Sequence, residues 1–205
     1  MKKYIFLDID GVINPIGNDA VKEDSIYSLV SLLNEIKSNN FLPVIVISSS
    51  WRLMNNLNDI ILYLGKEVKS LTHEFDITCS KEIYTNFENN DGKETQINNR
   101  YLEIKNYLEE HNIQFNNYVI LDDSNGLFFK KHLNNIKYLI YNYLGQKINE
   151  NTVDENNNLE FDNFTDIEID INKSFVDTSK KEGLYFNAYL SYKNIEDCIR
   201  ILKLN

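Results

Sequence analysis

Two aspartates near the amino end of the chain, Asp8 and Asp10, have the types and spacing for phosphoryl transfer. They follow an apolar run at 4–7 and precede Gly11 in the string LDIDGVIN. An aspartate directly after a buried strand, a second aspartate and a glycine that permits tight backbone geometry could direct both carboxylates toward one ligand. One carboxylate can attack phosphorus and form an aspartyl phosphate, which splits hydrolysis into two displacements. The other can protonate the leaving oxygen and then deprotonate the attacking water.

Polar side chains also follow two later apolar runs. The cluster Ser48–Ser50 comes after the run at 44–47, and the pair Asp122-Asp123 comes after the run at 118–121. In open α/β sheets, ligands bind just outside the carboxyl ends of the strands. If the three strands are neighbours, four carboxylates and several hydroxyl groups converge on one small volume.

Such a group of carboxylates requires a compensating positive charge. Repulsion between two carboxylates about 4 Å apart costs on the order of 4 kcal/mol at an effective dielectric constant near 20. The group must therefore take up protons or hold a cation. All-oxygen ligation, with no histidine or cysteine nearby in the sequence, selects a hard ion, and Mg²⁺ is the usual one. In the alternative interpretation, the aspartates only form strand-end turns and cap helices.

The elements that must position these residues alternate between strand and helix patterns, which is typical of an α/β sheet with crossover helices. Continuous apolar runs predict buried parallel strands, and apolar residues at helical spacing predict helices. The strands are expected at 4–7, 44–47 and 118–121, and the helices at 24–38, 53–64, 99–111 and 192–203. Gly65 is favoured just past the end of the second helix.

The pattern is weaker in the intervening segments. We expect a short strand near 68–71 or 76–79, a polar loop over 86–99, a short helix within 124–135 and a strand at 136–141. The acidic, Asn-rich stretch at about 142–173 contains alternating fragments and is interpreted as a hairpin insertion. Neither an internal repeat nor an interdomain linker is evident.

Composition excludes several classes of protein. The 205 residues are 42% hydrophobic and 25% charged, which is typical of one globular domain rather than a disordered chain. The net charge of −10 opposes non-specific attraction to nucleic acid or to anionic lipid. Only two cysteines occur, without a disulfide framework, and no signal-peptide core or apolar run of membrane-spanning length is present. We therefore expect a cytoplasmic protein without a membrane or disulfide-linked partner; the oligomeric state stays open.

Four strings of this chain resemble, in order, the four motifs of haloacid dehalogenase-like (HAD) phosphatases. They are FLDIDGVIN, VIVISSSWR, NRYLEIKNYL and YVILDDSN. The likeness is strongest to the bacterial HAD branch associated with RNA-repair-like proteins, whose tail is similar to Phe175–Thr178, Gly183-Leu184 and the helix from about 192. The resemblance implies a three-layer α/β/α Rossmann-like fold with a central, mostly parallel sheet. It also implies a single catalytic domain over 1–205.

The resemblance further implies a role for each acidic motif residue. Asp8 is expected to be the nucleophile and a magnesium ligand. Asp10 is expected to be the general acid and base, and to offer its backbone carbonyl to the metal. Asp122 and Asp123 are expected to complete the metal site, with Asp123 favoured as the direct ligand.

The basic residue of the site is less clearly marked. The resemblance assigns to Arg100, at the start of its helix, the neutralisation of charge as the phosphoryl group transfers. This residue is most often a lysine in the superfamily. Lys105 on the same helix and Lys93 in the preceding loop are therefore kept as alternatives.

The serine cluster and the two residues after it are expected to meet the substrate. The resemblance implies that one serine supplies a hydroxyl group to the phosphoryl oxygens; strand length favours Ser48 and alignment with the branch favours Ser49. Trp51 could be a stacking platform and Arg52 an anion clamp beside the site. Alternatively, Trp51 only covers the edge of the core.

The expected function is that of a Mg²⁺-dependent phosphatase that acts through an aspartyl phosphate. The short segments between the motifs leave room for at most a minimal cap domain, so the open site suits a bulky or nucleotide-like phosphorylated substrate. A polynucleotide-end phosphatase or nucleotidase is one alternative, although the acidic charge opposes it. An interaction module that keeps the fold without turnover is the other.

Overall fold

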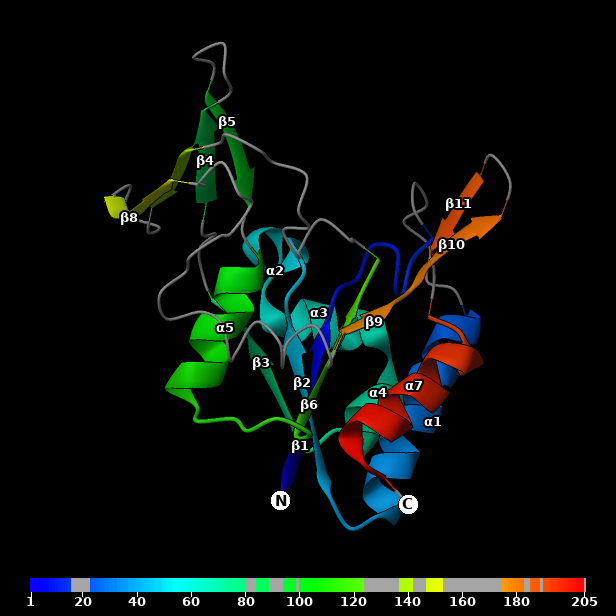
Figure 1. The fold of residues 1–205 in the computed structure, drawn as a ribbon. Helices are drawn as coiled ribbons and strands as arrows, with labels where there is room; N and C mark the ends of the chain where they lie inside the picture. The colour runs from blue at the N-terminus through cyan, green and yellow to red at the C-terminus, as the bar shows by residue number, and fades with distance from the viewer. Residues whose placement is uncertain are drawn as a thin grey trace.

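A five-stranded parallel sheet forms the centre of the protein, in the strand order β3-β2-β1-β6-β9 (Figure 1). Each neighbouring pair is parallel. The strands are β1 (Lys2–Leu7), β2 (Leu42–Ile47), β3 (Glu74–Ile77), β6 (Tyr118–Asp122) and β9 (Phe175–Asp177). The computed structural model describes residues 1–15, 23–79, 84–88, 94–98, 100–123, 137–141, 147–152, 175–182, 185–188 and 190–204.

Helices cover both faces of this sheet, so the predicted three-layer α/β/α fold is confirmed. The helices are α1 (Glu23–Ser38), α2 (Trp51–Met54), α3 (Leu57–Leu64), α4 (Lys66–Leu71), α5 (Arg100–Glu110) and α7 (Tyr192–Leu202). Apolar residues of α1, α3, α4 and α7 share one core cluster with Ile5 and Leu7 of β1. On the other face, residues of α5 pack against Phe6. Side chains of successive β1 residues therefore point to opposite faces of the sheet, as the pleat of a strand requires.

The apolar runs explain why the central strands form where they do. Strands β1, β2 and β6 are buried on both faces, and their continuous apolar sequences match that environment. The strands expected at 4–7, 44–47 and 118–121 are therefore confirmed, with small extensions at their ends. The helices expected at 24–38, 99–111 and 192–203 are also confirmed, as α1, α5 and α7.

The single helix expected over 53–64 is wrong, because the chain forms two helices there. Asn55 has an extended backbone, and the side chain of Asn56 accepts a hydrogen bond from the backbone N–H of Asp59, which caps α3. The cap begins a new helix after the short α2. Gly65, with φ +93°, ends α3 and directly precedes α4, so the strand alternative at 68–71 is also wrong. Strand β3 overlaps the other alternative at 76–79.

A second, antiparallel sheet has the strand order β5-β4-β7-β8. Its strands are β4 (Tyr84–Glu88), β5 (Glu94–Asn98), β7 (Lys137–Tyr141) and β8 (Lys147–Thr152). Figure 1 draws β4 and β5 beyond the end of the main sheet to which β1 and β2 run. The polar loop expected over 86–99 is therefore wrong, since two paired strands lie there, whereas the strand expected at 136–141 is confirmed as β7.

Parts of the expected insertion and one expected helix lie outside the described residues. Strand β8 falls within the stretch 142–173, but 153–173 is not described, and neither is the expected helix at 124–135. A further hairpin joins β10 (Ser179–Glu182) to β11 (Tyr185–Ala188). Among the described helices, none has both the length and the apolar character to cross a membrane.

Candidate active site

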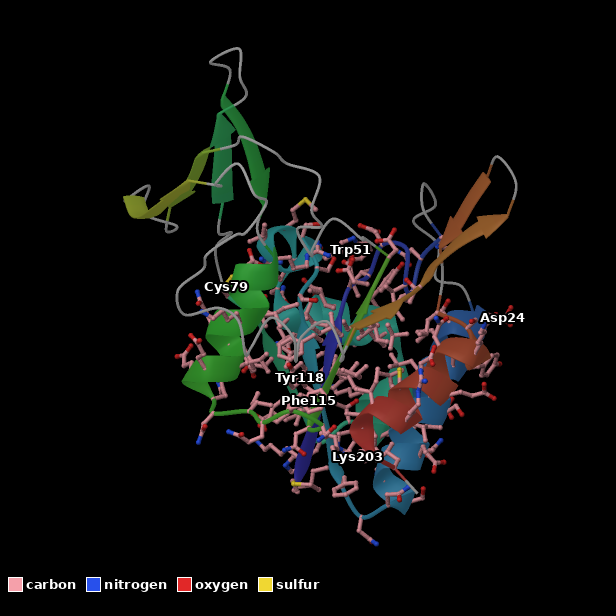
Figure 2. All side chains as sticks on the ribbon, viewed as in Figure 1. Asp24, Trp51, Cys79, Phe115, Tyr118 and Lys203 are labelled. Carbon is pink, nitrogen blue, oxygen red and sulfur yellow. The ribbon has the colours of Figure 1, made fainter. Side chains whose placement is uncertain are left out.

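The strand register brings the predicted polar residues to the same edge of the main sheet. Leu7 pairs with Ile47 of β2 and with Leu121 of β6, so the next residues, Asp8, Ser48 and Asp122, come level with one another. Figure 2 shows Trp51 at this upper end of the sheet, and Tyr118, the first residue of β6, lower down. The three polar clusters of the sequence therefore meet at one place.

The carboxylate of Asp8 is buried and held by two donors. Its side chain has 7% of its surface exposed. The backbone N–H of Ile9 donates to Oδ1 at 2.8 Å, and Nη1 of Arg100 donates to Oδ2 at 2.7 Å. Because hydrogen bonds from both sides fix its orientation, this carboxylate is preorganised to act on a ligand above the sheet edge.

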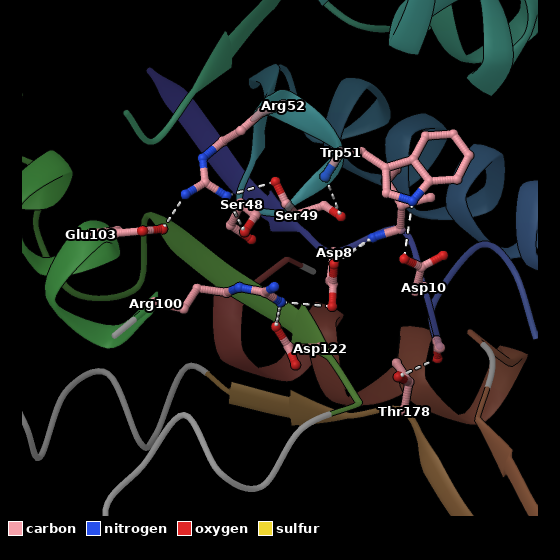
Figure 3. A network of polar contacts seen from close by, with 12 residues as sticks. Asp8, Asp10, Ser48, Ser49, Trp51, Arg52, Arg100, Glu103, Asp122 and Thr178 are labelled. Carbon is pink, nitrogen blue, oxygen red and sulfur yellow. Dashed lines mark hydrogen bonds and ion pairs between the residues drawn. The ribbon is translucent and has the colours of Figure 1, made fainter. Parts of the chain in front are cut away.

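Arg100 is the basic residue that the structure brings to this carboxylate. It is the first residue of α5, and its Nη1 also donates to Oδ2 of Asp122 at 2.7 Å (Figure 3). Burial alone would lower the pKa of the guanidinium, but the charges of Asp8 and Asp122 outweigh burial and raise it. Lys105 instead pairs with Glu109 at 3.3 Å on the same helix. The third alternative, Lys93, lies outside the described residues.

Three carboxylates form a group suited to a divalent cation. Asp8, Asp122 and Asp123 each offer one oxygen, and these oxygens lie within 4.8 Å of one another. The donor set is all-oxygen and anionic, which fits Mg²⁺ rather than a softer transition metal. The carboxylate of Asp10 is not part of this group, and the expected ligation through the Asp10 backbone carbonyl stays a prediction.

Gly11 allows the turn after β1 to pack against the third carboxylate. A Cβ atom on Gly11 would lie 2.2 Å from Oδ2 of Asp123, and the backbone has φ +75°. The hydroxyl of Thr178 donates to the carbonyl of Gly11 at 2.8 Å, and the N–H of Thr178 donates to the carbonyl of Asp122 at 3.0 Å. Thr178 therefore ties the turn after β1 to the end of β6. The sequence indicated Thr178 only through the resemblance of the tail Phe175–Thr178 to that of the HAD branch.

The Asp10 carboxylate is held by two side chains, and a third side chain supports them. The indole Nε1–H of Trp51 donates to Oδ2 of Asp10 at 3.0 Å, and the side-chain amide of Asn14 donates to Oδ1 at 3.4 Å. The hydroxyl of Tyr63 in turn donates to Asn14, and its ring lies 4.8 Å from the Trp51 ring. Trp51 thus packs at the edge of the core and orients the expected acid and base. Asn14 ends the motif FLDIDGVIN but was assigned no role there, and the sequence contained no signal for Tyr63.

The two serines left open by the sequence differ in their hydrogen bonds. Both residues are fully buried. Among the described residues, the buried Oγ atom of Ser48 has no hydrogen-bond partner, whereas Oγ of Ser49 accepts from the N–H of Trp51 at 3.4 Å. A buried hydroxyl without a partner is costly and calls for an explanation. A phosphoryl oxygen at the sheet edge would provide that partner for Ser48.

Arg52 does not fit the anion clamp expected from the sequence. Its side chain is fully buried and forms an ion pair of 2.6 Å with Glu103 of α5. It also donates to the backbone carbonyls of Ser48, Ser49 and Cys79. A guanidinium enclosed by acceptors of its own chain cannot meet a soluble anion, so this expectation is corrected. Glu103 lies 51 residues away in sequence, and no local pattern indicated the pairing.

This combination of fold and site is that of the HAD superfamily, which consists generally of phosphatase-type hydrolases that typically use Mg²⁺. The central strand of a parallel sheet ends in the turn that carries Asp8 and Asp10, and the adjacent strand ends in Asp122 and Asp123. The chain belongs to the family described as the HAD domain in Swiss Army Knife RNA repair proteins, whose model matches residues 4–139. The resemblance found in the sequence is thereby confirmed. No curated protein matches the chain significantly.

Proposed function

We propose that this protein is a Mg²⁺-dependent phosphatase that hydrolyses phosphate monoesters through an aspartyl phosphate on Asp8. One observation carries the proposal. The Asp8 carboxylate is buried, receives a hydrogen bond from Arg100 at 2.7 Å, and has an oxygen within 4.8 Å of oxygens of Asp122 and Asp123. A nucleophile, its neutralising cation and a set of metal-ligating oxygens therefore share one small volume.

In the first displacement, a carboxylate oxygen of Asp8 forms a bond to phosphorus while the bond from phosphorus to the leaving oxygen breaks. Asp10, oriented by Trp51 and Asn14, gives its proton to that leaving oxygen. The hydroxyl of Ser48, which has no partner in the described part of the chain, donates to a phosphoryl oxygen, and Arg100 offsets the negative charge of the group in transit.

In the second displacement, water attacks the phosphorus of the aspartyl phosphate. Asp10 takes the proton of that water, the bond from phosphorus to Asp8 breaks, and the carboxylate is regenerated with inorganic phosphate released. Asp8, Asp122 and Asp123 would hold Mg²⁺, which supplies neutralisation of the phosphate charge and alignment of the reacting oxygens.

Hydrolysis of p-nitrophenyl phosphate tests the proposal, with Mg²⁺ and with EDTA. We expect wild-type turnover that requires Mg²⁺, and loss of turnover in Asp8→Asn, because an amide is a poor nucleophile. Asp24→Asn, on the exposed start of α1, is the matched control and should behave as wild type. Equal rates for wild type and Asp8→Asn would remove the proposal.

For the substrate we propose a nucleotide or the phosphorylated end of a polynucleotide. The family description names RNA repair proteins, which supports this class. The net charge of −10 opposes extended phosphate contacts, so we expect recognition of the end rather than of a long strand. Comparison of kcat/KM on 3′- and 5′-phosphorylated oligonucleotides, a mononucleotide and a sugar phosphate checks this. A preference for the sugar phosphate would contradict it.

A catalytically silent interaction module is the alternative. The oriented carboxylate of Asp10 argues against it, since binding alone does not need an acid and base beside the nucleophile. The absence of turnover across the whole substrate panel, together with tight binding of a partner, would favour the module.

A further inference from the structure

A buried ion pair joins α2 to α5 next to Ser48 and Ser49 of the candidate site. Nη2 of Arg52 lies 2.6 Å from Oε2 of Glu103, and neither side chain has exposed surface (Figure 3). The proposed reaction uses neither group. Because a buried ion pair is weak support for stability and can often be replaced by apolar residues, its presence here calls for another explanation.

The remaining donors of Arg52 hold two turns at the end of the main sheet. Nη1 donates to the carbonyl of Ser48 at 3.1 Å and to that of Ser49 at 2.6 Å, and Nε donates to the carbonyl of Cys79 at 3.0 Å. Ser48 and Ser49 follow β2, and Cys79 comes shortly after β3. A planar guanidinium with several donors is suited to such multiple fixation, and a lysine could not reproduce it.

The other partner, Glu103, lies one helical turn from the phosphate-facing arginine. Arg100 and Glu103 are three residues apart on α5, so the two side chains project from neighbouring positions of the helix. The ion pair with Arg52 therefore fixes the first turn of α5 relative to the turn that carries Ser48. These two segments supply the two groups that are proposed to contact the phosphoryl oxygens.

We propose that Arg52 and Glu103 are positioning residues that set the separation between the Ser48 hydroxyl and the Arg100 guanidinium. This inference rests on the proposed phosphatase function. Both groups act on charge that grows as the phosphoryl group transfers, so a small misplacement lowers kcat more than it raises KM. A pair that served only stability would lower the amount of folded protein and leave kcat of the folded fraction unchanged.

Glu103→Gln tests the inference because it keeps an acceptor for Arg52 but removes the charge. We expect kcat on p-nitrophenyl phosphate to fall about 10- to 100-fold, with KM changed less than about threefold. Glu109→Gln, on the exposed side of the same helix and paired with Lys105, is the matched control and should retain wild-type kcat. All rates are normalised to folded protein measured by urea unfolding.

The double variant Arg52→Met/Glu103→Leu removes both charges together, so no unpaired buried charge remains. Because it also removes the hydrogen bonds to the carbonyls of Ser48, Ser49 and Cys79, we expect a lower unfolding free energy and, in the folded fraction, a loss of kcat similar to that of Glu103→Gln. If wild type is active and both variants match Glu109→Gln, the inference is wrong and the proposed function stands. If every variant of the pair unfolds, the pair serves stability and the inference is also overturned. An inactive wild type would instead contradict the proposed function.

Discussion

Replacement of Arg100 by methionine tests how positive and negative charges are balanced at the edge of the main sheet. One nitrogen of Arg100 lies 2.7 Å from an oxygen of both Asp8 and Asp122. The Asp122 side chain has no exposed surface, and 7% of that of Asp8 is exposed. Removal of one partner of a buried ion pair leaves an uncompensated charge and costs about 3–5 kcal/mol. We expect Arg100→Met to lose that much unfolding free energy in EDTA.

Mg²⁺ should restore more stability to this variant than it adds to wild type. In wild type the guanidinium contacts two of the three carboxylates and offsets one unit of their negative charge, whereas in Arg100→Met a divalent ion would have to offset all of it. A ligand present at 100 times its Kd stabilises the folded state by about 2.7 kcal/mol. We therefore expect the unfolding free energy of Arg100→Met, measured with urea, to regain most of its loss at saturating Mg²⁺. Its kcat should stay about 10²- to 10³-fold below that of wild type.

Arg200→Met is the matched control for this experiment. Arg200 pairs with Asp197 on the surface, with 77% of the arginine side chain exposed. Such pairs contribute about 0–1 kcal/mol, so the control should show no special response to Mg²⁺. The reasoning is refuted if Arg100→Met is as stable as wild type in EDTA, or if Mg²⁺ stabilises the two proteins equally.

Two further changes test the close packing of the site and of the core. Gly11→Ala should lose about 1–2 kcal/mol of unfolding free energy because φ is +75°. It should also bind Mg²⁺ about 10- to 100-fold more weakly, because the added Cβ displaces Asp123. Calorimetric titration measures the Mg²⁺ affinity. Burial raises the pKa of the Cys198 thiol above its ordinary value of 9.0, so above pH 9 the unfolded chain loses a proton that the folded chain keeps. Wild-type unfolding free energy should therefore fall with pH more steeply than that of Cys198→Ala, by about 1.4 kcal/mol per pH unit.

Each of these changes has a control within the same chain. Gly65 also has positive φ, but an added Cβ would meet nothing within 4 Å, so Gly65→Ala should lose stability without a change in Mg²⁺ affinity. Unchanged Mg²⁺ affinity in Gly11→Ala would show that the close approach of Gly11 to Asp123 does not fix the position of that carboxylate. Ile195→Ala, at a buried residue of the same helix without a titratable group, should keep the wild-type slope with pH. Parallel pH curves for wild type and Cys198→Ala would contradict the assignment.

The sequence predicted the parts of the fold that depend on local patterns. The central strands were found because burial on both faces demands unbroken apolar runs such as residues 44–47. Strands β4 and β5 were missed because Tyr84–Glu88 and Glu94–Asn98 are rich in polar residues, a composition that also suits a loop. The break before α3 was missed because the apolar spacing continues through Asn56 and predicts one helix. The cap that Asn56 forms instead begins a new helix.

The expected convergence of residues at strand ends is seen in the structure, whereas contacts decided by long-range packing were not predicted. Asp8 and Asp122 follow from strand geometry alone, since parallel strands end at one edge of a sheet. The burial of Arg52 depends on Glu103, a partner from a distant helix, so an arginine after the serine cluster was misinterpreted as an anion clamp. The role of Thr178 likewise depends on how β9 pairs with β6.

Direct detection of a phosphorylated Asp8 is the most decisive measurement. Asp10→Asn should accumulate the aspartyl phosphate from p-nitrophenyl phosphate and Mg²⁺, because p-nitrophenolate leaves without a proton whereas attack by water needs the base. After acid quenching and borohydride reduction, peptide mass spectrometry should find homoserine at position 8. Turnover that leaves position 8 unmodified, with a phosphoryl group on another residue or on none, would contradict the central claim.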